Sequence, residues 1–139
     1  MVKRVLDKIS EKYTDQLYAI FRILAGFLFF QHGAQKLFGW FSKNPNPIPF
    51  DLGNIMWYAG VIEVVAGILI LLGLFTRYAA VVAALEMFVA YFYSHVPKGY
   101  LPPQNGGELA VLYFAIALVL LSQGSRAWSL ERGIFKKEH

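Results

Sequence analysis

The stretch GNIMWYAGVIEVVAGILILLGLF, residues 53–75, decides the fold of this chain. It contains one charged residue, Glu63, and otherwise consists almost entirely of apolar side chains and glycine. A helix needs about 20 mostly apolar residues to cross the hydrocarbon core of a bilayer. The stretch therefore predicts a transmembrane helix with one carboxyl group near its middle.

Three further apolar segments, at about residues 17–38, 78–96 and 107–123, have similar lengths. Two connections, around residues 39–52 and 97–106, are rich in proline and glycine, which end helices. The remaining connection, near Thr76 and Arg77, is very short and predicts a tight hairpin. We expect a single all-α domain, an antiparallel bundle of four transmembrane helices.

Composition excludes a soluble domain. Hydrophobic residues make up 57% of the 139 residues and charged residues only 16%, against about 25% charged residues in a typical soluble domain. The chain has no cysteine, which excludes disulfides, thiolate nucleophiles and cysteine-bound iron–sulfur clusters. The net charge of +4 lies at the ends of apolar runs, without the basic and aromatic stripe that nucleic-acid binding requires.

The distribution of basic residues predicts an orientation. Three lie on the side of the two long loops: Lys36, Lys43 and Lys98. Nine lie on the side of both termini: Lys3, Arg4, Lys8, Lys12, Arg77, Arg126, Arg132, Lys136 and Lys137. Because cytoplasmic segments are enriched in Lys and Arg, we expect both termini in the cytoplasm and both proline-rich loops outside.

Residues 1–14 place apolar side chains on one helical face and basic side chains on the other. This pattern is typical of a short amphipathic helix that lies on an anionic membrane surface. It is equally consistent with the solvated start of the first transmembrane helix.

Ionisable residues inside the apolar segments are candidates for a functional site, because a charge at the bilayer centre costs about 2.5–3.5 kcal/mol on insertion scales. By their depth in the predicted helices, two are central, one belongs to the cytoplasmic half, and three belong to the outer third. They are, in that order, Glu63 and Glu86, then Arg22, then His32, Lys36 and Glu108.

Small residues predict which helices meet. Gly60 and Gly67 share a face with Glu63, and Gly26 and Gly33 form a similar stripe on the first helix. We expect the first two helices to pack along these glycines, so that His32 or Lys36 meets Glu63 or Glu108. Such pairs are also consistent with a structural role, in which Arg22 and Lys36 neutralise carboxylates and fix the helix register.

Two histidines, His32 and His95, lie near the outer ends of their helices and raise the idea of axial haem ligation. No supporting motif accompanies them, and we assign no metal site. The chain also has no phosphate-binding loop, dinucleotide fingerprint or zinc-protease motif.

Several motifs together resemble the DoxX family. They are RILAG at 22–26, HGAQKL at 32–37, GVIEVVAG at 60–67, LGLFTR at 72–77 and GGE at 106–108. The resemblance implies a four-helix protein of a bacterial or archaeal cell membrane. Some members of the family are similar to small subunits of thiosulfate:quinone oxidoreductases, and others resemble partners of redox-stress proteins.

The first hypothesis is a membrane subunit of an oxidoreductase that contacts quinone or a redox partner through the outer polar groups. His32 and Lys36 would hold a carbonyl oxygen, Glu63 would exchange a proton, and Glu108 would connect the site to water. Glu86 and Arg22 complete the set of candidate ligand-binding residues. The sequence offers no redox centre, so electrons would come from a partner or a bound cofactor, and whether the chain itself is an enzyme stays open.

Two alternatives remain. The chain is a scaffold or assembly partner whose buried charges are structural, or it is a small-solute or proton-linked carrier. Because four helices form a poor pathway alone, the carrier would require a homo-oligomer.

Overall fold

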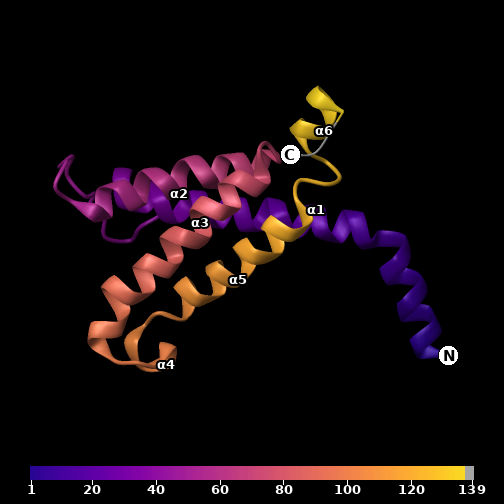
Figure 1. Ribbon diagram of the computed structural model, residues 1–139, viewed down its shortest axis with the longest axis horizontal. Coiled ribbons are helices and arrows are strands. Elements are labelled where there is room, and N and C mark those ends of the chain that lie inside the picture. The colour runs from indigo at the N-terminus through magenta and orange to yellow at the C-terminus, as the bar shows by residue number, and fades with distance from the viewer. Residues whose placement is uncertain (137–139) are drawn as a thin grey trace.

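The computed structural model describes residues 1–136 of the chain, and its regular elements are all helices (Figure 1). Lys137, counted above for the orientation, lies outside the described residues. The long helices are α1 (Val2–Phe38), α2 (Ile55–Leu72), α3 (Thr76–Ala90) and α5 (Glu108–Gln123). A π-helical turn (Tyr91–His95) and a 3-10 turn (Val96–Lys98) extend α3, and two short helices, α4 (Pro102–Asn105) and α6 (Leu130–Phe135), complete the structure. The predicted all-α membrane bundle is confirmed.

The surface of the bundle is apolar. Within the described residues, α1, α2 and the segment Thr76–Lys98 are long and apolar enough to cross a membrane. Helix α5 is also apolar but is shorter, at 16 residues. Large hydrophobic side chains face outward along these helices, such as Leu85 and Phe88 on α3. Hydrocarbon around the bundle accommodates these side chains, because lipid tails are as apolar as they are.

The four long helices form two pairs, α1 with α2 and α3 with α5, and the second pair is inclined to the first (Figure 1). The expected glycine contact in the first pair is confirmed. A Cβ at Gly26 would overlap the backbone of Leu71, and a Cβ at Gly67 would overlap that of Phe30. Backbones approach this closely only where side chains are absent, which explains the extensive contact between α1 and α2.

A short turn connects α2 to α3, the first helix of the second pair. Helix α2 ends at Leu72 because Gly73 adopts a left-handed conformation, with φ of 66°. Phe75 is also left-handed, and α3 begins at Thr76, so the hairpin lies a few residues earlier than the sequence suggested. From this turn α2 and α3 separate toward the opposite end of the bundle, where the two long loops lie (Figure 1).

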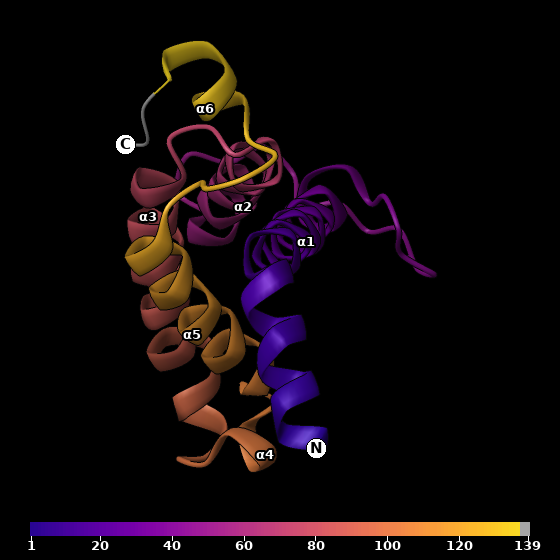
Figure 2. The same cartoon turned by 90° about the vertical axis from the view of Figure 1, so that its right-hand side faces the viewer.

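The start of α1 and the short helix α6 lie at the end of the bundle opposite the long loops, as Figures 1 and 2 show. The first 16 residues of α1 are exposed and continue the helix beyond the bundle. The helix bends in this part, where Thr14 donates to the carbonyl of Ser10 and Ser10 to that of Asp7. Side-chain bonds of this kind compete with the helical ladder and bend helices. The interfacial position of residues 1–14 stays a prediction.

Candidate functional site

The buried ionisable residues form two separate groups. We call His32, Lys36, Glu63 and Glu86 the loop-end cluster, because they lie toward the end of the bundle that carries the long loops. We call Arg22, Thr76, Ser125 and Glu131 the terminal-end cluster, because they lie beside the C-terminal segment. Of the six candidates from the sequence, the structure brings four together and places Arg22 and Glu108 elsewhere.

The loop-end cluster is built on the contact between α1 and α2. Lys36 Nζ donates to Glu63 Oε1 at 2.7 Å, and the side chain of Glu63 is completely buried. The glycine stripe makes this pair possible, because a Cβ at Gly33 would overlap Gly60 and Glu63. His32 lies on the same face of α1, with its Nε2 3.9 Å from Glu63 Oε1. The pair expected from the sequence, Lys36 with Glu63, is therefore present.

The carboxyl groups of Glu63 and Glu86 lie within hydrogen-bonding reach of each other across α2 and α3. Among the described residues, no donor reaches Glu63 Oε2 or either carboxyl oxygen of Glu86, although all three atoms are buried. Buried polar atoms without partners are rare and costly in folded proteins. These three oxygens are therefore candidates for bonds to a proton shared between the carboxyl groups or to a ligand.

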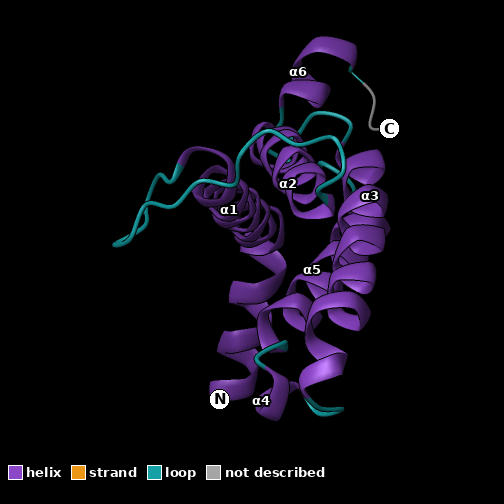
Figure 3. Cartoon of the chain, turned by 90° about the vertical axis from the view of Figure 1, so that its left-hand side faces the viewer, coloured by secondary structure: helices purple, strands orange, loops and turns teal. Residues whose placement is uncertain are grey.

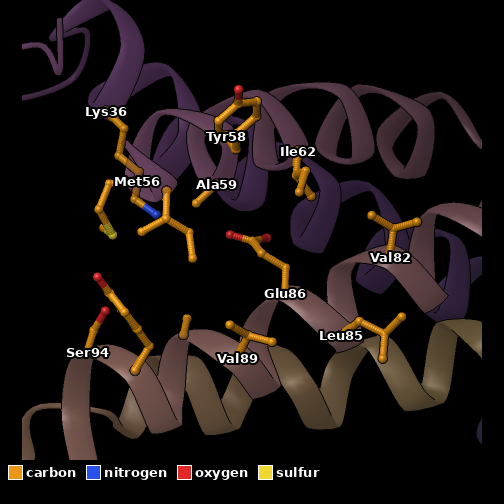
Figure 4. A pocket seen from close by; sticks show the side chains of 13 residues that line it. Lys36, Met56, Tyr58, Ala59, Ile62, Val82, Leu85, Glu86, Val89 and Ser94 are labelled. Carbon is orange, nitrogen blue, oxygen red and sulfur yellow. The ribbon is translucent and has the colours of Figure 1, made fainter. Parts of the chain in front are cut away.

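A cavity of about 300 Å³ opens beside Glu86, between the separating helices α2 and α3. Lys36 from α1 and Glu86 from α3 point into it from opposite sides (Figure 4). Apolar side chains such as Ile62 and Val89 form most of the remaining wall. The cavity thus offers an ammonium group and a carboxyl group in apolar surroundings, which is the usual composition of a small-molecule site.

The π-helical turn at the end of α3 contributes Tyr93 and Ser94 to the same cavity. Turns of this type often occur at functional sites, because the wider turn redirects side chains. Neither residue is distinguished in the sequence, because the regular apolar pattern of the segment carries no signal for the extra residue in the turn.

His32 lies near Glu63 but is not among the residues that line the cavity. Its ring centroid is 6.3 Å from that of Tyr113 on α5, and Tyr113 also packs on Phe29 at 5.2 Å. Tyr113 is the one polar side chain in the run Leu109–Leu121, and this signal could have selected it from the sequence. His32 therefore lies beside Glu63 and is not part of the cavity wall.

The other two outer candidates lie apart from the cavity. Glu108 is exposed in the first turn of α5, where a carboxylate interacts favourably with the helix dipole. His95 Nδ1 is 3.2 Å from the carbonyl oxygen of Asn105, a buried residue that also bonds Gly99 and Gly107. His95 thus belongs to the loop framework. Within residues 1–136, no group of three His, Cys, Asp or Glu side chains is arranged to hold a metal ion.

The terminal-end cluster is organised by Arg22, whose side chain is completely buried. Its Nη1 donates to the carbonyls of Ile70 and Leu71 at 2.7 and 2.8 Å, at the end of α2. Its Nη2 donates to those of Ala127 and Trp128 at 3.3 and 2.8 Å, in the C-terminal segment. Arg22 therefore satisfies the last carbonyls of a helix and fastens the C-terminal segment over it.

Glu131 also holds the C-terminal segment in place. It was not among the residues predicted from the sequence. Its side chain is fully buried and accepts a hydrogen bond from Ser125, while Ser125 Oγ also lies 2.8 Å from Thr76 Oγ1. Its backbone N–H donates to the carbonyl of Gly73. Glu131 lies in a short polar tail, so hydropathy gives no sign that its carboxyl group is buried.

Comparison with known proteins gives one family. The DoxX family model matches residues 17–96 of the chain. A Haemophilus influenzae protein described as uncharacterized is 40% identical over 136 residues, which cover 91% of this chain and 97% of that protein. A second protein of this bacterium, described in the same way, is 31% identical over 124 residues, covering 84% of this chain and 82% of its own length.

An uncharacterized membrane protein of Mycobacterium tuberculosis, Rv3486, is 32% identical over 132 residues, covering 84% of this chain and 80% of that protein. No solved structure matches the chain.

Proposed function

The chain belongs to the DoxX family of membrane proteins, and we propose that it is the membrane subunit of an oxidoreductase system that binds a quinone in the cavity between α2 and α3. The observation that carries the proposal is the pair of oxygens of Glu86, which are buried beside the cavity and lack a hydrogen-bond donor among the described residues. A ligand that reaches this cavity from the bilayer must be apolar and must bear a polar group that matches Lys36 and Glu86.

The residues of the cavity fit the carbonyl oxygen of a quinone. Lys36 has three N–H donors and uses one for Glu63, so two remain for a carbonyl oxygen in the cavity. Glu86 lies across the cavity from Lys36 (Figure 4) and supplies a group that donates or accepts a proton. The apolar wall excludes water, which strengthens each of these hydrogen bonds. A quinone would supply the capacity to take up electrons and protons together.

The balance of charge supports a proton shared by Glu63 and Glu86. One ammonium group faces two carboxyl groups in a site of low polarity, and a single proton on the carboxyl pair would make the cluster neutral. The shared proton would also provide the missing donor between the two side chains. Glu63 would then hold Lys36, Glu86 would carry the proton that is exchanged in the cavity, and His32 would connect Glu63 to the other side of the bundle.

Electrons would come from a partner subunit or a cofactor that the partner holds. The loops at residues 39–54 and 99–107 lie at the end of the bundle toward which α2 and α3 separate (Figure 1), and their exposed residues would form the surface for such a partner or for a second copy of the chain.

We propose that the protein lies in a bacterial or archaeal cell (inner) membrane with both termini in the cytoplasm, because the basic residues are concentrated near the termini. The lack of cysteine makes this easy to test, because a single cysteine can be introduced. A membrane-impermeant maleimide should label Asn46→Cys in intact cells and Lys3→Cys only after the membrane is opened. The reverse pattern would contradict this orientation.

Equilibrium binding of a benzoquinone to the protein in lipid nanodiscs tests the proposed function. Replacement of Glu86 by leucine removes a polar partner from the cavity and should weaken binding up to about tenfold, since a hydrogen bond to an uncharged group is worth about 0.5–1.5 kcal/mol. The matched control is Glu108→Leu, which removes an exposed carboxylate away from the cavity and should bind as the wild type does. Equal binding by all three proteins, or no binding by any, would contradict the proposal.

A scaffold function is the second candidate. The Lys36–Glu63 ion pair favours it, because this pair joins α1 to α2 and fixes the register in which the two helices pack. It makes a different prediction. Quinone would not bind in any variant, and loss of Lys36 would reduce recovery of a partner or the yield of folded protein instead.

A further inference from the structure

A second cavity, of about 320 Å³, continues the first along the groove between α2 and α3. The two cavities share Ile62 and Val82, so they meet at these side chains. The second cavity extends from this junction toward the short turn, as far as Leu69 and Tyr78. We call it the lower groove.

The two cavities differ in polarity. The first contains the ammonium group of Lys36 and the carboxyl group of Glu86, whereas the lower groove is lined by apolar side chains and by Tyr78. Ala66 and Ala79 keep it open, because larger side chains at these positions would fill the space between the helices. Together the cavities suit a molecule with a polar head at one end and an uncharged, unbranched chain at the other.

The length of the groove indicates the length of that chain. Glu86 and Tyr78 are eight residues apart on α3, which corresponds to about 12 Å along the helix axis. An extended decyl chain is of comparable length. The chain would run parallel to α3 and to the lipid tails, so a ligand could enter sideways from the bilayer without turning.

We propose that the lower groove binds the tail of the quinone and that the protein therefore selects long-tailed quinones over the same ring without a tail. This inference rests on the proposed function, because it takes the head group to lie between Lys36 and Glu86. It adds a specificity element, with Val82 at the junction through which the tail must pass.

The expected selectivity is modest for a physical reason. A tail in the bilayer is already in an apolar medium, so its transfer into the groove gains nothing from the hydrophobic effect. The gain comes from closer packing against the groove walls. We expect about tenfold tighter binding of a decyl-substituted ring than of the bare ring, each referred to its concentration in the membrane, which corresponds to about 1.4 kcal/mol.

The test measures binding of both rings in nanodiscs, with two matched variants of the full chain. Val65→Phe places a ring in the lower groove, and Val81→Phe makes the same change at a position that contributes to neither cavity. Both valines are partly exposed, 52% and 40%, so neither change should disturb the core. Because Val65 does not line the first cavity, Val65→Phe should abolish the tenfold preference and leave binding of the bare ring unchanged, while Val81→Phe should behave as the wild type.

A photoreactive group at the end of the decyl tail gives an independent readout. Labelling of residues 61–69 of α2 and 78–82 of α3, identified by mass spectrometry, would support the inference. Labels elsewhere, or a tail preference that survives in Val65→Phe, would overturn the inference. The proposed function would still stand if the bare ring binds through Glu86. If the bare ring fails to bind and a photoreactive fatty acid labels the lower groove equally well, both proposals fail.

Discussion

The two polar clusters bury similar groups at opposite ends of the bundle, and they differ in how those groups are satisfied. At the terminal end, all four Nη–H groups of Arg22 reach backbone carbonyls, and the carboxyl group of Glu131 bonds to Ser125. At the loop end, Glu63 has one ionic partner, and three carboxyl oxygens lack a donor among the described residues. The terminal-end cluster leaves two buried atoms without a partner among the described residues, Arg22 Nε and Glu131 Oε1, and neither residue lines the cavities between α2 and α3.

This difference in hydrogen bonding indicates which buried polar groups are free to bind a ligand. A buried polar group whose bonds are made within the chain stabilises one arrangement of the backbone, and it has little left to offer a ligand. A buried polar group that lacks partners beside a cavity costs stability, and such a cost persists in proteins mainly at functional sites. The difference therefore supports our proposal that the loop-end cluster binds a ligand, whereas the terminal-end cluster stabilises the fold.

The largest effect should come from Arg22→Met. It leaves the carbonyls at the end of α2 and in the C-terminal segment without their donor, and we expect a loss of about 3–5 kcal/mol in the free energy of unfolding, as for the loss of one partner of a buried charged group. Thermal unfolding in detergent, followed by circular dichroism, measures it. Arg126→Met is the matched control, because Arg126 forms an exposed ion pair with Asp15 and should contribute less than about 1 kcal/mol. Equal effects of the two changes would show that buried Arg22 stabilises the fold no more than an exposed ion pair does, which would contradict the role given to the terminal-end cluster.

Gly67→Ala should have the next largest effect, since its Cβ would force α1 and α2 apart at Phe30. Overpacking of this kind costs about 1–3 kcal/mol. Gly133→Ala is the control, because a Cβ there meets open space. Unchanged thermal stability of Gly67→Ala would show that the helices are not held at the distance described.

Lys36→Met tests whether the ion pair of the loop-end cluster stabilises the fold. Alone it leaves Glu63 buried without a cation and should lower the free energy of unfolding by about 1–3 kcal/mol. The double variant Lys36→Met/Glu63→Met should recover most of that loss, because apolar replacements of a buried ion pair are often neutral. Quinone binding should stay lost in both variants. Recovery of binding together with stability would mean that the pair is only structural.

Glu86→Leu should have the smallest effect on stability. Since its oxygens have no donor among the described residues, their removal should change the free energy of unfolding by less than about 1 kcal/mol, or should raise it. The same protein should lose quinone affinity. A large loss of stability in Glu86→Leu would instead show that Glu86, like Arg22, stabilises the fold.

The sequence predicted the features that depend on apolar length and on small residues. Helical spans follow from hydropathy, and the contact of α1 with α2 follows from the spacing of Gly26, Gly33, Gly60 and Gly67. The Lys36–Glu63 pair was one of several pairs that this contact allowed. These properties are local or repeat at helical spacing, so they can be read along the chain.

The features that the sequence did not reveal depend on distant segments. Arg22 and Glu131 are more than a hundred residues apart, and no periodicity predicts that the C-terminal tail folds back over the end of α2. The cavity arises because α2 and α3 separate from a short turn, and their relative inclination is not encoded in the hydropathy of either helix. Figure 3 shows the tail and this inclination from the side of the long loops.

An infrared difference spectrum of the protein in nanodiscs, with and without a bound benzoquinone, tests the central claim most directly. We predict a band from a protonated carboxyl group that shifts when the quinone binds in the wild type and is absent in Glu86→Gln, while Glu131→Gln retains the shift. A spectrum that quinone leaves unchanged, or a shift that survives in Glu86→Gln and disappears in Glu131→Gln, would contradict the assignment of the loop-end cluster to ligand binding.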